Sequence, residues 1–326
     1  MVNMSTTTTR SSQSPPEPRR RPWRRRPRSV GQDQNALIGH SKIVPYALST
    51  PAIVVVGFLL AFPVLYAAFG SLYRAEFMGG ETEYVGFQNY IDLLSDADFL
   101  WALNRTAIFV GGCLVFGLSL SLVFAFALNK AGRRLRFLRG LTIVPYLVSG
   151  VAAAVMFRLL FNDQFGAVNR FIGWFGVEPP AWFADTGWVM LAAIATQVWT
   201  DLPLAVLLIL GGLQTIDPSL LDAAEVDGAT GWKRTTRVSL PLIVPQLAIA
   251  TIWLSYATLT SLGVVLALTG GGPLKATRTL PIHLYETAFI ELRRNEALAI
   301  VIVVLVLNGL LTLVYATFSR RFDLGN

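Results

Sequence analysis

The sequence predicts an all-α, polytopic membrane protein with six transmembrane helices. Of the 326 residues, 53% are hydrophobic and only 14% are charged, which excludes an ordinary soluble domain. Six apolar runs approach or exceed the length of about 20 residues that a helix needs to cross a bilayer, and no stretch shows the alternating pattern of a β-barrel. The predicted spans lie near residues 44–73, 106–128, 140–161, 187–213, 241–268 and 297–318.

The distribution of positive charge predicts the orientation of these spans. Residues 1–42 carry nine Lys/Arg and two acidic residues, a net charge of +7 that equals the net charge of the whole chain. Residues 130–139 carry five basic residues and no acid, and residues 320–321 are both arginine. By the positive-inside rule these segments, and therefore both termini, are cytoplasmic. The connectors then expected outside are 74–105, 162–186 and 269–296.

The ends of the chain differ in composition from the middle. Residues 1–42 are rich in Pro and Arg and lack the apolar content of a core, so we expect a disordered basic cytoplasmic tail. Such a tail favours contact with membrane lipid, and no nucleic acid partner is expected. Residues 43–321 form the transmembrane domain, and 322–326 a cytoplasmic C-terminus. The first span is too long for a signal peptide and is expected to be retained.

A polar island, residues 214–240, separates the fourth and fifth spans. Asp217 followed by Pro218 is typical of a helix start, with Asp217 as the N-cap and Pro218 at the first helical position. Gly228 is expected to end that helix in a left-handed conformation. Thr230 then caps a second short helix, which ends before Pro241. The island is therefore predicted to be a compact knob of two short helices on the membrane surface.

The charges of the island are unusual for a cytoplasmic loop. It is slightly acidic, although the positive-inside rule favours basic residues on this side. Asp222, Glu225 and Asp227 give the knob a charged face, while Ala223 and Ala224 allow close approach. This combination indicates a surface shaped by a protein partner.

The string 222–245, DAAEVDGATGWKRTTRVSLPLIVP, resembles the EAA loop of the permease subunits of binding-protein-dependent ABC importers. That pattern is roughly E-A-A-x-x-D-G-A followed by a later I-x-L-P, and Asp222 stands where the family has Glu. The positions that match are Ala223, Ala224, Asp227, Gly228, Ala229, Val238, Leu240, Pro241 and Pro245. The resemblance implies that a separate ATPase docks on the island, with the coupling residues Asp222, Ala223, Ala224, Glu225, Asp227, Gly228 and Ala229.

The resemblance extends over about residues 44–321. The segments YVGFQNY (84–90), WTDLP (199–203) and LTGGGP (268–273) are similar to sugar-importer permeases related to the first permease of the maltose system. This implies the type I ABC importer permease fold, with a five-helix core over about 100–321. The implied partners are a second homologous permease, two copies of an ATPase subunit and an extracytoplasmic solute-binding protein. The implied location is the bacterial cytoplasmic (inner) membrane.

The chain lacks its own source of energy. No G-x-x-x-x-G-K-[ST] phosphate loop is present, and no series of intramembrane carboxylates and histidines suits a proton relay. We therefore expect no cofactor in this chain, with ATP and Mg used by the partner ATPase. No cluster of metal ligands or nucleophiles suggests an enzyme. A self-sufficient secondary carrier remains an alternative of another class.

Polar residues within the spans are the candidates for solute binding. Asp201 is the one acid placed deep in a span, and intramembrane carboxylates are costly enough to suggest function. Gln197 lies one turn earlier on the same face. In the fifth span hydroxyl side chains recur at 4-3-3 spacing, which places them on one helical stripe: Thr251, Ser255, Thr258 and Ser261. Neutral hydroxyls and an amide suit a polyhydroxylated solute.

The resemblance implies a related set of sugar-contacting positions, namely Tyr146, Gly150, Gln197, Thr200, Asp201, Thr258 and Ser261. Several of these side chains differ from the maltose pattern, which argues against maltose itself. Tyr146, Trp199 and Tyr256 offer flat faces for a sugar ring. Two alternatives stay open. In the first, the Ser/Thr stripe and Asp201 join helices by hydrogen bonds instead of contacting solute. In the second, the solute is a polyol phosphate.

Overall fold

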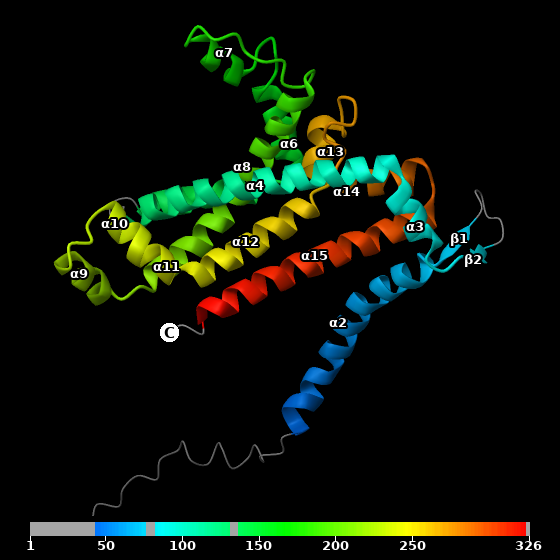
Figure 1. Cartoon of the computed structure of the whole chain (residues 1–326), viewed down its shortest axis with the longest axis horizontal. Helices are drawn as coiled ribbons and strands as arrows, with labels where there is room; N and C mark the ends of the chain where they lie inside the picture. The colour runs from blue at the N-terminus through cyan, green and yellow to red at the C-terminus, as the bar shows by residue number, and fades with distance from the viewer. Residues whose placement is uncertain (1–42, 76–81, 131–135, 324–326) are drawn as a thin grey trace, which may run out of the picture. The chain divides into compact units, whose positions relative to one another are not determined.

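The structure is a computed structural model that describes residues 43–75, 82–130 and 136–323 (Figure 1). The basic tail 1–42 and the centre of the basic connector, residues 131–135, lie outside the described residues, so the prediction of a disordered tail stays a prediction. The chain divides into two units between Phe58 and Leu59, and each is described by itself.

Helices account for nearly all of the described elements. The long helices are α2 (Ile43–Gly70), α4 (Ala97–Lys130), α8 (Thr186–Gln214), α12 (Val244–Leu259) and α15 (Arg294–Asp323). The shorter helices are α3 (Gln88–Ser95), α5 (Arg136–Ile143), η2 (Val144–Leu147), α6 (Gly150–Leu160), α7 (Ala167–Gly173), α9 (Pro218–Val226), α10 (Trp232–Arg234), η3 (Thr235–Ser239), α11 (Leu240–Leu242), α13 (Gly263–Thr269), α14 (Leu280–Tyr285) and η4 (Glu286–Ile290). Strands β1 (Tyr73–Ala75) and β2 (Thr82–Tyr84) form one antiparallel pair.

Helices suited to cross a membrane agree in number with the six predicted spans. Within the described residues, four helices are long and apolar enough: Ser49–Gly70, Ala97–Lys130, Thr186–Gln214 and Arg294–Thr317. Two bent pairs also qualify, Phe137–Leu147 with Gly150–Leu160 and Trp232–Leu242 with Val244–Leu259. Six spans result if each pair counts as one.

The predicted span 140–161 is sharply bent in the structure. Its two halves meet at an angle of 96°. Pro145 has no N–H to donate to a preceding carbonyl, which weakens the helix at η2. Val148 and Ser149 are extended, with ψ of 131° and 137°, and a new helix begins at Gly150.

The predicted span 241–268 is wrong in its second half. α12 ends at Leu259, and α13 begins only at Gly263. The backbone N–H of Thr260 still donates to the carbonyl of Tyr256 over 3.1 Å, and Ser261 and Leu262 then belong to neither helix. Ser261, expected on the helical stripe, therefore lies in the break.

The long helices of the second unit pack side by side. α4 packs against α8, and α12 packs against α4, α8 and α15, as Figure 1 shows. One cluster of buried apolar side chains, around Phe109 and Ile194, joins α4 and α8 to α6, α13 and α14. A second, around Ile209 and Ile243, joins α4 and α8 to the start of α12. Figure 1 places α9 and α10 at one end of this bundle and α3 and α14 at the other.

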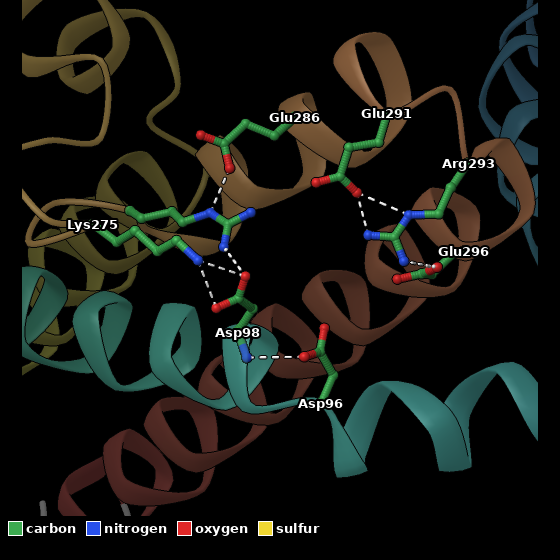
Figure 2. A network of polar contacts seen from close by, with 8 residues as sticks. Asp96, Asp98, Lys275, Glu286, Glu291, Arg293 and Glu296 are labelled. Carbon is green, nitrogen blue, oxygen red and sulfur yellow. Dashed lines mark hydrogen bonds and ion pairs between the residues drawn. The ribbon is translucent and has the colours of Figure 1, made fainter.

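Ion pairs tie the α14 end of the bundle together (Figure 2). Arg278 is 5% exposed, donates to Asp98 over 2.9 Å and also pairs with Glu286. Lys275 pairs with the same Asp98 at 2.7 Å. Burial lowers the pKa of Arg278, but its hydrogen bonds to Asp98 and Glu286 outweigh this effect, so the pKa is raised. Arg278 thus joins the start of α4 to η4.

Replacing Arg278 with Met is expected to destabilise this end of the protein. Removing one partner of a buried ion pair costs about 3–5 kcal/mol. Because the Asp98 side chain is 45% exposed, we expect a smaller loss of about 2 kcal/mol, measured as a lower Tm of the detergent-purified protein. Arg293→Met is the matched control: Arg293 pairs with Glu291 and Glu296 beside the network but is 48% exposed. Equal Tm values for the two variants would contradict the assigned role of Arg278.

Candidate functional site

The polar island folds into the predicted knob of short helices. Asp217 caps α9, and its Oδ1 accepts from the backbone N–H of Ser219 over 2.9 Å. This bond, with a second from the Ser219 side chain, lowers the pKa of Asp217. Pro218 occupies the first turn as expected. The predicted start of the first helix of the knob is therefore confirmed.

Gly228 ends α9 as predicted, in the left-handed conformation with φ of +77°. Its N–H donates to the carbonyl of Glu225 over 3.1 Å, and the N–H of Ala229 donates to the carbonyl of Ala224 over 2.8 Å. This pair of bonds is the Schellman motif, which satisfies the free carbonyls at a helix C-terminus. The residues of the EAA-type pattern thus set the direction in which the chain leaves α9.

The predicted cap of the second short helix is wrong. The N-cap of α10 is Gly231, with φ of +53° and no side-chain bond. Thr230 contributes its carbonyl instead, which accepts from Lys233 over 3.1 Å. Glycine enters the left-handed region without steric cost, so the backbone conformation, rather than a capping hydroxyl, decides where α10 starts.

The predicted coupling residues lie together on the surface of the knob. Asp222, Ala223, Glu225, Asp227 and Gly228 are exposed, and Ala224 and Ala229 are half-buried. Glu225 also forms an ion pair with Arg234 of α10 at 3.3 Å. Since both side chains are well exposed, this pair adds at most about 1 kcal/mol.

The knob also exposes large apolar side chains that the sequence interpretation did not single out, and two of them are almost fully exposed. Val226 at the end of α9 is 88% exposed, and Trp232 at the start of α10 is 79% exposed. Aromatic and apolar anchors surrounded by polar residues are typical of protein interfaces. A signal for them was present in the sequence, since each is an apolar residue within a polar island.

A chain of buried hydrogen bonds crosses the middle of the bundle. Gln197 Nε2 donates to Asp201 Oδ2 over 2.7 Å within α8, and Ser261 Oγ donates to Gln197 Oε1 over 2.6 Å. The three side chains are 3%, 6% and 9% exposed, respectively, for Gln197, Asp201 and Ser261. The structure therefore brings these predicted residues together, although Ser261 reaches the group from the break after α12.

The remaining hydroxyls of the stripe bond mainly to their own helix. Thr251 and Thr258 donate to the carbonyls of Leu247 and Leu254, each over 2.7 Å. Ser255 donates to the carbonyl of Thr251 over 2.8 Å and contacts the hydroxyl of Tyr315 at 3.1 Å. Ser255 thereby joins α12 to α15, a contact that the sequence did not indicate. Thr200 likewise donates to the carbonyl of Thr196 over 3.0 Å.

The predicted aromatic positions lie in separate surroundings. Tyr146 of η2 is 42% exposed and packs against Trp253, with ring centres 6.5 Å apart. Trp199 packs edge-on against Phe157 and lines an apolar hollow of about 390 Å³ between α4, α6 and α8. Trp199 thus lies in apolar surroundings, whereas Gln197 and Asp201, two positions away on either side, lie in the buried hydrogen-bond chain. Tyr256 is 56% exposed.

Gly150 begins α6 where a side chain has little room. A Cβ at this position would lie 3.0 Å from Cγ2 of Val264 in α13. The glycine therefore permits close packing of α6 on α13.

No group of three or more His, Cys, Asp or Glu side chains suited to a metal occurs within the described ranges.

Comparison with known proteins identifies the family. Residues 114–324 match the family model of the binding-protein-dependent transport system inner membrane component. The chain is 31% identical over 288 residues to the sn-glycerol-3-phosphate transport system permease protein of Agrobacterium fabrum, covering 86% of this chain and 95% of that protein. It is 33% identical over 272 residues to the protein of the same name in Salmonella typhimurium, covering 82% and 91%. It is 29% identical over 289 residues to the sulfoquinovosyl glycerol transport system permease protein of Agrobacterium fabrum, covering 86% and 92%.

Solved structures support the predicted fold. A chain from a bacterial ABC transporter involved in the import of the acidic polysaccharide alginate matches with a TM-score of 0.73 and 21% identity, covering 90% of this chain and 98% of that chain. At this identity the match shows the fold alone, which is the all-α polytopic permease fold of ABC importers. The family model and the relatives together settle the class of protein. The chain therefore belongs to the binding-protein-dependent transport system inner membrane components, as a multi-pass permease subunit of an ABC importer rather than an enzyme.

Proposed function

We propose that this chain imports a carbohydrate or carbohydrate derivative as one of two homologous permeases. Two copies of an ATPase subunit dock on the 214–240 loops, and an extracytoplasmic solute-binding protein delivers the solute. ATP and Mg belong to the ATPase, and both termini of this chain lie in the cytoplasm. The observation that carries the proposal is the exposed knob with Val226 and Trp232 at its surface, held in a defined orientation by the Gly228 turn.

Two features support a solute with many hydroxyl groups. The buried chain of Ser261, Gln197 and Asp201 combines a hydroxyl, an amide and a carboxylate, which together offer both donors and acceptors. Relatives that cover most of the chain are named for sn-glycerol 3-phosphate and sulfoquinovosyl glycerol, and a fold neighbour for alginate. Those names favour polyhydroxylated solutes and keep a polyol phosphate as the second candidate.

The knob transmits the closure of the ATPase subunits to the membrane-spanning helices. When ATP closes the two ATPase subunits, their approach carries the docked knobs with it. Each knob is continuous with α8 on one side and with α11 and α12 on the other, so α8, which carries Gln197 and Asp201, moves with the knob. A two-state change of this kind converts an inward-open into an outward-open arrangement.

The test is reconstitution of the complete importer. The tagged chain is purified from its native membrane with its co-purifying subunits and inserted into liposomes with the solute-binding protein. We expect uptake of a radiolabelled carbohydrate or glycerol 3-phosphate that requires both ATP and the binding protein. Uptake that proceeds without ATP, or purification without any ATPase subunit, would contradict the proposal.

A further inference from the structure

We propose that Arg105, stacked on Trp101 in α4, binds the anionic group of a negatively charged carbohydrate derivative as it enters the importer. This inference rests on the proposed function and narrows it to one class of solute. The evidence is the fixed position of the guanidinium, its missing counter-charge and its place at the outer end of α4.

The guanidinium of Arg105 is held in place by a tryptophan. Its Cζ lies 4.0 Å from the centre of the Trp101 ring, an arrangement in which the cation is attracted to the face of the indole. Trp101 is itself anchored, because its Nε1 donates to the carbonyl of Lys275 over 2.9 Å. The indole remains 41% exposed. A guanidinium with a fixed orientation loses little freedom when it binds a ligand.

Arg105 has no counter-charge within the described part of the chain. None of the ion pairs there includes it, and its buried Nε has no hydrogen-bond partner. The neighbouring cations Lys275 and Arg278 are already matched by Asp98 and Glu286. An arginine with unused donors is suited to carboxylate, phosphate or sulfonate oxygens, which it binds with two parallel hydrogen bonds.

Arg105 lies at the outer end of its span. α4 begins at Ala97 and has 34 residues, a length of about 51 Å, which exceeds the roughly 30 Å of a bilayer core. The first two turns of α4 can therefore extend beyond the membrane core, at the edge where the predicted span 106–128 begins. An arginine that only reached for the membrane surface would extend its head into water, whereas this one lies against Trp101 with its Nε buried.

The place of Arg105 suits an entry site. Its neighbour Thr106 accepts a hydrogen bond from the backbone N–H of Leu280 in α14 over 2.8 Å, which places Arg105 at the α14 end of α4. Figure 1 shows this end of the bundle opposite the knob of α9 and α10. If the knob faces the ATPase, Arg105 faces the side from which solute arrives. Along α4 and α8, the polar chain of Gln197 and Asp201 lies deeper in the bundle. The cation would therefore attract an anionic solute before it reaches the hydroxyl-binding groups.

The experiment compares charged and neutral solutes in the reconstituted importer. The probes are two radiolabelled pairs, glycerol 3-phosphate with glycerol and glucuronate with glucose, each supplied with the solute-binding protein. We expect wild type to take up an anionic member in preference to its neutral partner. Arg105→Gln should raise KM for the anionic member at least tenfold while kcat changes little, and Arg105→Lys should restore part of the loss. Arg293→Gln, an arginine with its own carboxylates, is the control.

Three results would overturn the inference. The anion site is ruled out if the wild-type importer transports only the neutral members. It is also ruled out if the Arg105→Gln variant has an unchanged KM for the anionic member. An equal loss for charged and neutral members, together with lost affinity for the solute-binding protein in a separate binding assay, would assign Arg105 to a protein contact instead. If no member of either pair is taken up with ATP, the proposed function itself fails. ATP-driven uptake of glucuronate or glycerol 3-phosphate with a KM that Arg105→Gln leaves unchanged removes this inference alone.

Discussion

Gly228→Val is expected to uncouple the permease from its ATPase. Gly228 holds φ of +77°, and a non-glycine residue in the left-handed region costs roughly 1–2 kcal/mol, with β-branched valine among the least tolerated. A Cβ here meets no atom within 4 Å, so the effect comes from the backbone alone. If the strain turns the knob out of its docking orientation, solute-stimulated ATP hydrolysis should fall about 5- to 30-fold.

The control for this prediction is Gly228→Asn. Asparagine adds a side chain of similar size but accepts the left-handed conformation more readily, so hydrolysis should stay near the wild-type rate. Co-purification of the ATPase subunit with each variant separates weak docking from failed folding. A valine variant that binds the ATPase and hydrolyses ATP as wild type does would remove the assigned role of the knob.

Asp201→Leu is expected to abolish uptake. The substitution removes the acceptor of the 2.7 Å bond from Gln197 and leaves a buried amide donor unpaired, which costs about 1–3 kcal/mol. If the carboxylate also accepts from solute hydroxyls, its charge-assisted bonds are lost as well. Together these terms predict a fall in uptake on the order of 100-fold. Asp201→Asn keeps an acceptor oxygen without the charge and should lower uptake by about tenfold.

Assembly decides which role Asp201 has. For a solute contact, the leucine variant still co-purifies with the second permease and the ATPase while uptake is lost. For a bond between helices or permeases, the complex fails to form. Thr251→Val is the matched control, because the Thr251 hydroxyl belongs to the same predicted stripe but bonds to the Leu247 carbonyl. Normal uptake by Asp201→Leu would eliminate both roles.

The sequence alone determined the class of protein and the local structure of the knob. The Asp217–Pro218 start and the Gly228 stop depend on interactions within a few residues, and the structure reproduces both. The number of spans agrees with the structure if each bent pair counts as one. The EAA-type pattern was readable for the same reason: its residues are adjacent, and the turn they form uses backbone bonds between neighbours. The pairing of Gln197 with Asp201 was likewise visible, since one helical turn separates them.

The tertiary structure decided which polar groups meet and which stand alone. Ser261 reaches Gln197 only because α12 breaks at Thr260, and periodicity had placed it on an unbroken helix. The packing of α6 on α13 brings Gly150 close to Val264, which lies more than a hundred positions away in the sequence. Whether Arg105 has a counter-charge depends on Asp98 being taken by Lys275 and Arg278. Such competition between distant side chains leaves no periodic signal in a sequence, because it is settled only when α4, α14 and η4 come together.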